Sequence, residues 1–63
     1  MKYEVGMIIF IIHIANEEEE YFGRVGVIEK IDDIGQLHGS WGGLALIPNV
    51  DEFVVVGDLY AQQ

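Results

Sequence analysis

Eight acidic residues in three short clusters are the side chains best suited to contact a partner. They are Glu17, Glu18, Glu19, Glu20, Asp32, Asp33, Asp51 and Glu52. Charge runs in the loops of small domains are usually solvated and serve solubility. The alternative is that these carboxylates imitate nucleic-acid phosphates, since neighbouring phosphates lie about 6–7 Å apart, close to the spacing of alternate residues along a strand. Such a surface would occupy a basic nucleic-acid channel and would be drawn to it by long-range attraction.

The residues that usually carry catalysis or bind metals are few and poorly spaced. His13 and His38 are the only histidines, and the chain has no cysteine. Asp32, Asp33 and His38 match no recognised metal-ligand spacing. Ser40 follows His38 by two residues, but no acid is placed to orient the histidine, and a domain of 63 residues hardly encloses a pocket of about 300 Å3. We therefore expect no enzymatic activity, no metal and no cofactor.

A nucleic-acid interface would rest on Arg24, Lys30 and Trp41. Eleven Asp and Glu against three Lys and Arg give a net charge of −8, which repels phosphate. Trp41 is expected to fill the core with Leu37 and Leu46 rather than to stack on bases. Direct binding of nucleic acid is therefore the weakest of the functions considered.

The segment 7–15 is apolar on both faces when it is extended. Met7, Ile9, Ile11, His13 and Ala15 point one way, and Ile8, Phe10, Ile12 and Ile14 point the other. A half-exposed strand should alternate apolar with polar residues, and a small barrel buries only one face of a strand. We expect Ile8, Phe10 and Ile12 to form an apolar interface. Its cover is the glutamate-rich loop with Leu59 and Tyr60, a second copy of the chain, or another partner.

The length of the chain and its punctuation indicate one small all-β domain over residues 1–63. Hydrophobic residues make up 51% of the 63, too many for a disordered tail. Strands are expected over residues 5–15, 22–31, 36–41, 44–47 and 52–56. Asp32, Asp33 and Gly35 predict a tight turn, Gly42 and Gly43 a hairpin turn, and residues 49–51 a turn of 3₁₀ type. The segment 16–20 is a loop or a single helical turn with capping-box spacing.

Five short strands without a long helix favour a small, strongly bent barrel, because closure covers apolar surface and removes open edges. An SH3-like barrel is preferred to an OB-like one, which usually needs a helix and more chain. The apolar run at residues 7–15 is too short to cross a membrane and fits a secretion signal poorly. We expect a cytoplasmic protein with no membrane contact.

Two stretches carry a resemblance to a known family. They are the sequence GRVGVI at 23–28 continuing to DDIGQLH at 32–38, and LALIPNVDEF at 44–53. The chain resembles small bacterial proteins with a domain of unknown function, whose members are frequent on phages, plasmids and other mobile elements. The resemblance implies an SH3-like fold and carries no activity or catalytic residue. The chain departs from the family pattern at Gly42 and Gly43, which directly follow Trp41, and in a first strand without alternating basic residues.

These observations predict an acidic protein-binding module that inhibits a host nucleic-acid-handling protein such as a nuclease, in the manner of an anti-CRISPR protein. The alternative is a structural or accessory interaction module, or a homodimer, without an inhibitory role. Composition and spacing leave open the partner, the oligomeric state and the face that binds.

Overall fold

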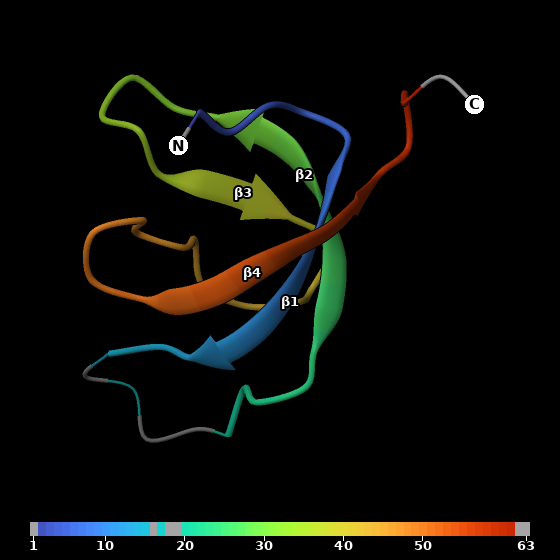
Figure 1. Ribbon diagram of the computed structural model, residues 1–63. Helices are drawn as coiled ribbons and strands as arrows, with labels where there is room; N and C mark the ends of the chain where they lie inside the picture. Colours follow the sequence, from blue (N-terminus) through green and yellow to red (C-terminus); the bar gives the residue numbers. More distant parts are fainter. Residues whose placement is uncertain (1, 16, 18–19, 62–63) are drawn as a thin grey trace.

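The computed structural model describes residues 2–15, 17 and 20–61, and over these the chain is all-β, as the sequence predicts. Four strands form one antiparallel sheet in the order β3-β2-β1-β4. Their bounds are Met7–His13 for β1, Val25–Ile31 for β2, Leu37–Gly39 for β3 and Glu52–Asp58 for β4. Figure 1 shows β4 lying along β1, and the long, bent β2 carrying the sheet round to β3.

The sheet bends at three places where one strand carries an extra residue. Ile11 and His13 of β1 pair with the adjacent residues Phe53 and Glu52, so Ile12 is the extra residue there. In the same way, Val56 is the extra residue of β4 where it pairs with β1, and Glu29 is the extra residue of β2 where it pairs with β3. A bulge of this kind increases the local twist and reverses which residues face inward. The bulges therefore curve the sheet around a core that lies on one side of it.

The predicted fifth strand, residues 44–47, is reduced to a single bridge. Leu46 exchanges both backbone hydrogen bonds with Leu37, at 2.9 Å each, and no longer strand forms around it. Consequently the described chain has four strands in an unclosed sheet, where five strands in a closed barrel were expected. The predicted helical turn of residues 16–20 falls largely on residues 16, 18 and 19, which lie outside the described ones.

The core gathers the inward side chains of β1, β2 and β3 with those of the segments that follow them. Its buried members are Ile9, Ile11, Ile14, Tyr21, Ile28, Leu37, Trp41 and Leu46. Packing of Trp41 with Leu37 and Leu46 is thus confirmed, and the indole Nε1 donates to the carbonyl of Leu44 at 2.8 Å. Gly26 lets β2 approach the backbone of Trp41, since a Cβ at this position would collide with the Trp41 amide nitrogen.

The turns follow the predicted chemistry more closely than the strand ends do. The Asp32 carboxylate accepts the backbone N–H of Ile34 and of Gln36 at 3.1 and 2.9 Å, which closes the turn between β2 and β3. The amides of Val50 and Asp51 both bond to the carbonyl of Ile47, forming the expected single turn before β4. The predicted two-residue hairpin turn at Gly42 and Gly43 does not form: both glycines have positive φ, but Leu37 pairs with Leu46, so a longer loop joins these residues.

Over the described residues there is no helix long and apolar enough to cross a membrane.

Candidate interaction surface

The outer side of the sheet, away from the core, carries a continuous group of apolar side chains from β1, β2, β4 and the segment before β2. We call this group the outer face; its members are Ile8, Phe10, Phe22, Val25, Val54 and Val56. Phe22, Val25, Val54 and Val56 keep 63%, 54%, 46% and 58% of their surface exposed. Large contiguous apolar patches are uncommon on soluble monomers and often belong to interaction sites.

Strand pairing places these side chains in register across three strands. Phe10 of β1 lies opposite Val25 of β2 on one side and Val54 of β4 on the other. Directly opposed residues on one face of an antiparallel pair have Cβ atoms about 4.5–5.5 Å apart. The ring of Phe22 meets that of Phe10 edge to face, with centroids 5.8 Å apart. The outer face is therefore one packed apolar surface rather than scattered single residues.

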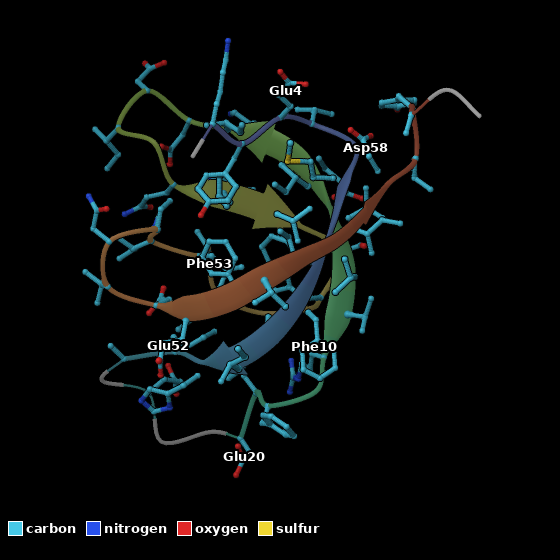
Figure 2. All side chains as sticks on the ribbon, in the orientation of Figure 1. Glu4, Phe10, Glu20, Glu52, Phe53 and Asp58 are labelled. Atoms are coloured by element: carbon cyan, nitrogen blue, oxygen red, sulfur yellow. The ribbon has the colours of Figure 1, made fainter. Side chains whose placement is uncertain are left out.

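The two sides of the β1–β4 pair differ in what they contact. Figure 2 shows Phe10 and Phe53 on opposite sides of this pair. Phe53 packs against the core and lies 5.4 Å from the Tyr3 ring, centroid to centroid. Phe10 points away from the core to the outer face. Strand β1 thus presents two apolar faces, as its sequence predicts, and only the inner one holds fully buried side chains, those of Ile9 and Ile11.

The bulge at Ile12 corrects the predicted facing of the last residues of this segment. Strict alternation puts Ile14 outside with Phe10, and His13 inside with Ile11. In the structure Ile14 is buried in the core and His13 is exposed. The extra residue reverses the alternation beyond Ile11, and Ile12 itself is exposed at the bulge. Of the three residues predicted to form an apolar interface, Ile8 and Phe10 belong to the outer face. Ile12 lies at the bulge where this face ends.

The tail after β4 was one predicted cover for this surface. Leu59 and Tyr60 are 60% and 70% exposed, so neither is buried against the sheet. The Leu59 amide bonds to the Gly6 carbonyl at 2.9 Å, and the Tyr60 ring lies over Gly6, where a Cβ would collide with it. The tail is held at the start of β1 and leaves Val25 and Val54 exposed.

Three of the eight predicted acidic contact residues have structural roles. Asp51 is only 7% exposed, and its Oδ1 and Oδ2 accept the amides of Ala15 and Ile47 at 2.9 and 2.8 Å. Asp32 closes the turn after β2, as described above. The third, Glu20, accepts the Phe22 amide at 3.4 Å and is exposed. Asp51 therefore does not belong to the accessible acidic surface.

The Asp32 carboxyl is held by hydrogen bonds from its own turn and from His38. Its Oδ2 lies 2.9 Å from Nε2 of His38, and this bond, followed by the Gln36 amide, lowers the pKa of Asp32 below its ordinary value. Burial opposes the shift and is outweighed. His38 thus pairs with an acid in a surface turn, and its neighbour Ser40 is engaged elsewhere, accepting the Val27 amide at 2.9 Å.

The exposed acids among the described residues lie at opposite ends of the sheet. Glu20 precedes β2, and Glu52 begins β4 opposite the last residue of β1, so both lie at one end; Figure 2 shows them there. Asp33 follows the other end of β2, about 20 Å away along seven strand residues. Glu17 is half-buried, whereas Glu18 and Glu19 lie outside the described residues. The structure therefore does not bring the three predicted clusters onto one surface.

Arg24 and Trp41, two of the residues considered for nucleic-acid binding, are committed to the fold. The Arg24 guanidinium donates to the Gly42 carbonyl at 2.7 Å and lies 4.2 Å above the Tyr21 ring. Trp41 is buried. Within the described residues there is no pocket, and no three acidic or histidine side chains are grouped as metal ligands would be.

Sequence reasoning missed Phe22, Val25, Val54 and Val56 as parts of the surface. A signal was present in the three consecutive valines of 54–56, which make the last strand apolar on both faces, as the first one is. These residues form one surface with Phe10 only because β1 lies between β2 and β4 in the sheet. That information is absent from a local pattern.

Comparison with known proteins identifies the family. A family model described as a domain of unknown function, DUF4314, matches residues 1–56, and the chain belongs to this family. No curated protein and no solved structure matches the chain.

Proposed function

Since the chain belongs to a family described only as a domain of unknown function, we propose its role from its surface: a non-enzymatic module that binds another protein through the outer face. The observation that carries the proposal is the packed row of Val25, Phe10 and Val54, whose two valines are about half exposed. Burying such side chains yields about 25 cal/mol per Å2, and a partner that covers the row would gain this energy.

The partner that suits this surface has a basic rim. The chain carries a net charge of −8, and Glu20 and Glu52 stand at one end of the sheet that bears the outer face. Long-range attraction would steer a positively charged protein to it. We therefore propose that the target is a nucleic-acid-handling protein of a bacterial host. The module would be a product of a phage or mobile element, and it would inhibit this target in the host cytoplasm. The separation of the acidic clusters argues for contact beside a basic channel rather than for an extended phosphate mimic.

For the fold we propose an SH3-like barrel with one incomplete strand. If the segment around Leu46 is counted as that strand, the strands pair in the order β4, β1, β2, β3 and then the Leu46 segment. A single turn at residues 47–51 leads into the last strand. Both features support the proposal.

A photo-crosslinking residue placed at Val25 tests the proposed function. In bacterial cells it should give adducts with one or a few other proteins, whereas the same residue at Ile34 should not. Ile34 is the matched control because it is 80% exposed and sits in the turn after β2, away from the outer face. Adducts only between copies of the chain would favour the homodimer. Equal adducts at both positions, or none, would contradict an interface on the outer face.

Salt separates the inhibitory role from an accessory one. Binding to a basic nuclease surface should weaken steeply as salt rises, because the Debye length falls from about 30 Å at 0.01 M to about 3 Å at 1 M. Isothermal titration calorimetry at several salt concentrations, with the purified partner that crosslinking identifies, measures the dissociation constant. A partner without nucleic-acid activity, bound equally at all salt concentrations, would favour the accessory module.

A further inference from the structure

One edge of strand β4 has no partner in the described structure. Strand β4 pairs with β1 along one side and ends the sheet on the other. Over the described residues, no backbone group of 52–57 makes a hydrogen bond outside that pairing. In an antiparallel ladder alternate residues direct their N–H and C=O groups to opposite edges, so about half of those in β4 point to the open side. An exposed apolar edge strand is a template for a further strand.

The open edge is continuous with the outer face. Val54 and Val56 belong to β4 and are 46% and 58% exposed. A strand added beside β4 would set its own outward side chains next to these valines, as cross-strand neighbours. Backbone pairing and apolar burial would then act together. The bulge at Val56 increases the local twist of this edge between Val55 and Gly57.

Charge decides what kind of strand fits. The first and last residues of β4 are acidic, Glu52 and Asp58, and Figure 2 shows them toward opposite ends of the strand. A second copy pairing through the same edge would bring together two chains that each carry a net charge of −8, with an acid at each end of both strands. Like charges directly opposite each other destabilise strand pairs. The edge therefore disfavours its own copy and favours a strand with cations at its ends.

We propose that β4 accepts an extended segment of a partner protein as an added strand, with alternating apolar residues and a Lys or Arg near each end. This inference rests on the proposed protein-binding function and specifies how the partner is held. Main-chain hydrogen bonds to β4 would supply affinity. The flanking cations, facing Glu52 and Asp58, would supply specificity.

The test uses a synthetic peptide of about seven residues, the length of β4, alternating valine and threonine between terminal lysines, added to the full chain. Amide hydrogen exchange followed by NMR is the measurement. Alternate amides within residues 52–56 should exchange at least about tenfold more slowly when the peptide is bound. Replacing both lysines by glutamate should weaken binding about tenfold, because two attractive cross-strand pairs become repulsive.

The matched control is the same peptide N-methylated at alternate residues, which lacks the backbone donors on one edge. Loss of binding with this control supports strand addition. Equal binding of both peptides, or shifts at Val25 and Phe10 without protection of β4 amides, would overturn strand addition while leaving the outer face as the binding surface. Absence of binding at millimolar peptide would also overturn it. Protection that rises with protein concentration alone would identify a second copy as the occupant and so refute the proposed partner.

Discussion

Asp51 joins two segments that are distant in the sequence. Its two carboxylate oxygens accept the amides of Ala15, just after β1, and of Ile47, before the turn that leads into β4. Asp51 itself is 7% exposed, so its carboxylate is largely shielded from water. A buried donor that loses its acceptor costs about 1–3 kcal/mol. Asp51 therefore stabilises the fold, although its position in an acidic pair suggests a surface role.

Replacing Asp51 by alanine should lower the free energy of unfolding by about 2–4 kcal/mol, because two amides lose their acceptor. Urea denaturation of the purified protein measures the change. Asp33→Ala is the matched control, since Asp33 is exposed and its side chain has no hydrogen-bond partner among the described residues; its effect should stay within about 0.5 kcal/mol. Equal stability of Asp51→Ala and Asp33→Ala would show that the two bonds contribute nothing.

At the scale of elements, the turn between β2 and β3 depends on one ionised carboxylate. Asp32 accepts two backbone amides and contacts His38, and together these lower its pKa. A carboxyl whose pKa is lower in the folded than in the unfolded state stabilises the fold above its ordinary pKa. That contribution disappears as the pH falls through the lowered value. The pairing of β2 with the three-residue β3 is thus sensitive to acid.

The free energy of unfolding should therefore fall as the pH drops below about 4, the ordinary pKa of an aspartate. Urea titrations at a series of pH values measure the slope for the protein and for Asp32→Asn. The variant should be less stable at neutral pH and should lose less stability in acid. Asp33→Asn, one residue along the same turn, should keep the slope of the unchanged protein. An unchanged slope in Asp32→Asn would exclude Asp32 as its source.

Strand ends were predicted less well than strand existence. The first strand was expected over residues 5–15 and the second over 22–31, whereas β1 is Met7–His13 and β2 is Val25–Ile31. The last strand extends to Asp58, beyond the predicted residue 56, because the sheet continues until the Leu59 amide bonds to Gly6. Apolar residues outside the strands, such as Ile14, still reach the core, so hydrophobicity alone does not mark where pairing stops.

For the whole molecule, the net charge of −8 opposes compactness. Eleven carboxylates and three cations in 63 residues repel one another more in the folded than in the unfolded chain. Small domains bury only about 60% of their surface, so they have little reserve against such repulsion. Salt should relieve it by screening.

Raising NaCl from about 20 mM to about 0.5 M at neutral pH should raise the free energy of unfolding by about 1 kcal/mol, as the Debye length shrinks. Thermal or urea denaturation measures the change. Near pH 4 many carboxylates take up protons, so the same salt step should have a much smaller effect. A gain of equal size at both pH values would point to a general effect of salt on apolar burial instead of charge screening.

The amino-acid sequence by itself determined the all-β class, the turns at residues 32–36 and 47–51, the core position of Trp41 and the two apolar faces of the first strand. These follow from alternation, turn chemistry and composition, which act over a few residues. Only the tertiary structure decided that residues 44–47 pair at a single bridge, that Ile14 faces inward, and that Val25 and Val54 flank Phe10. Bulges and strand neighbours arise from the closing of the sheet around one core, and no local pattern encodes them.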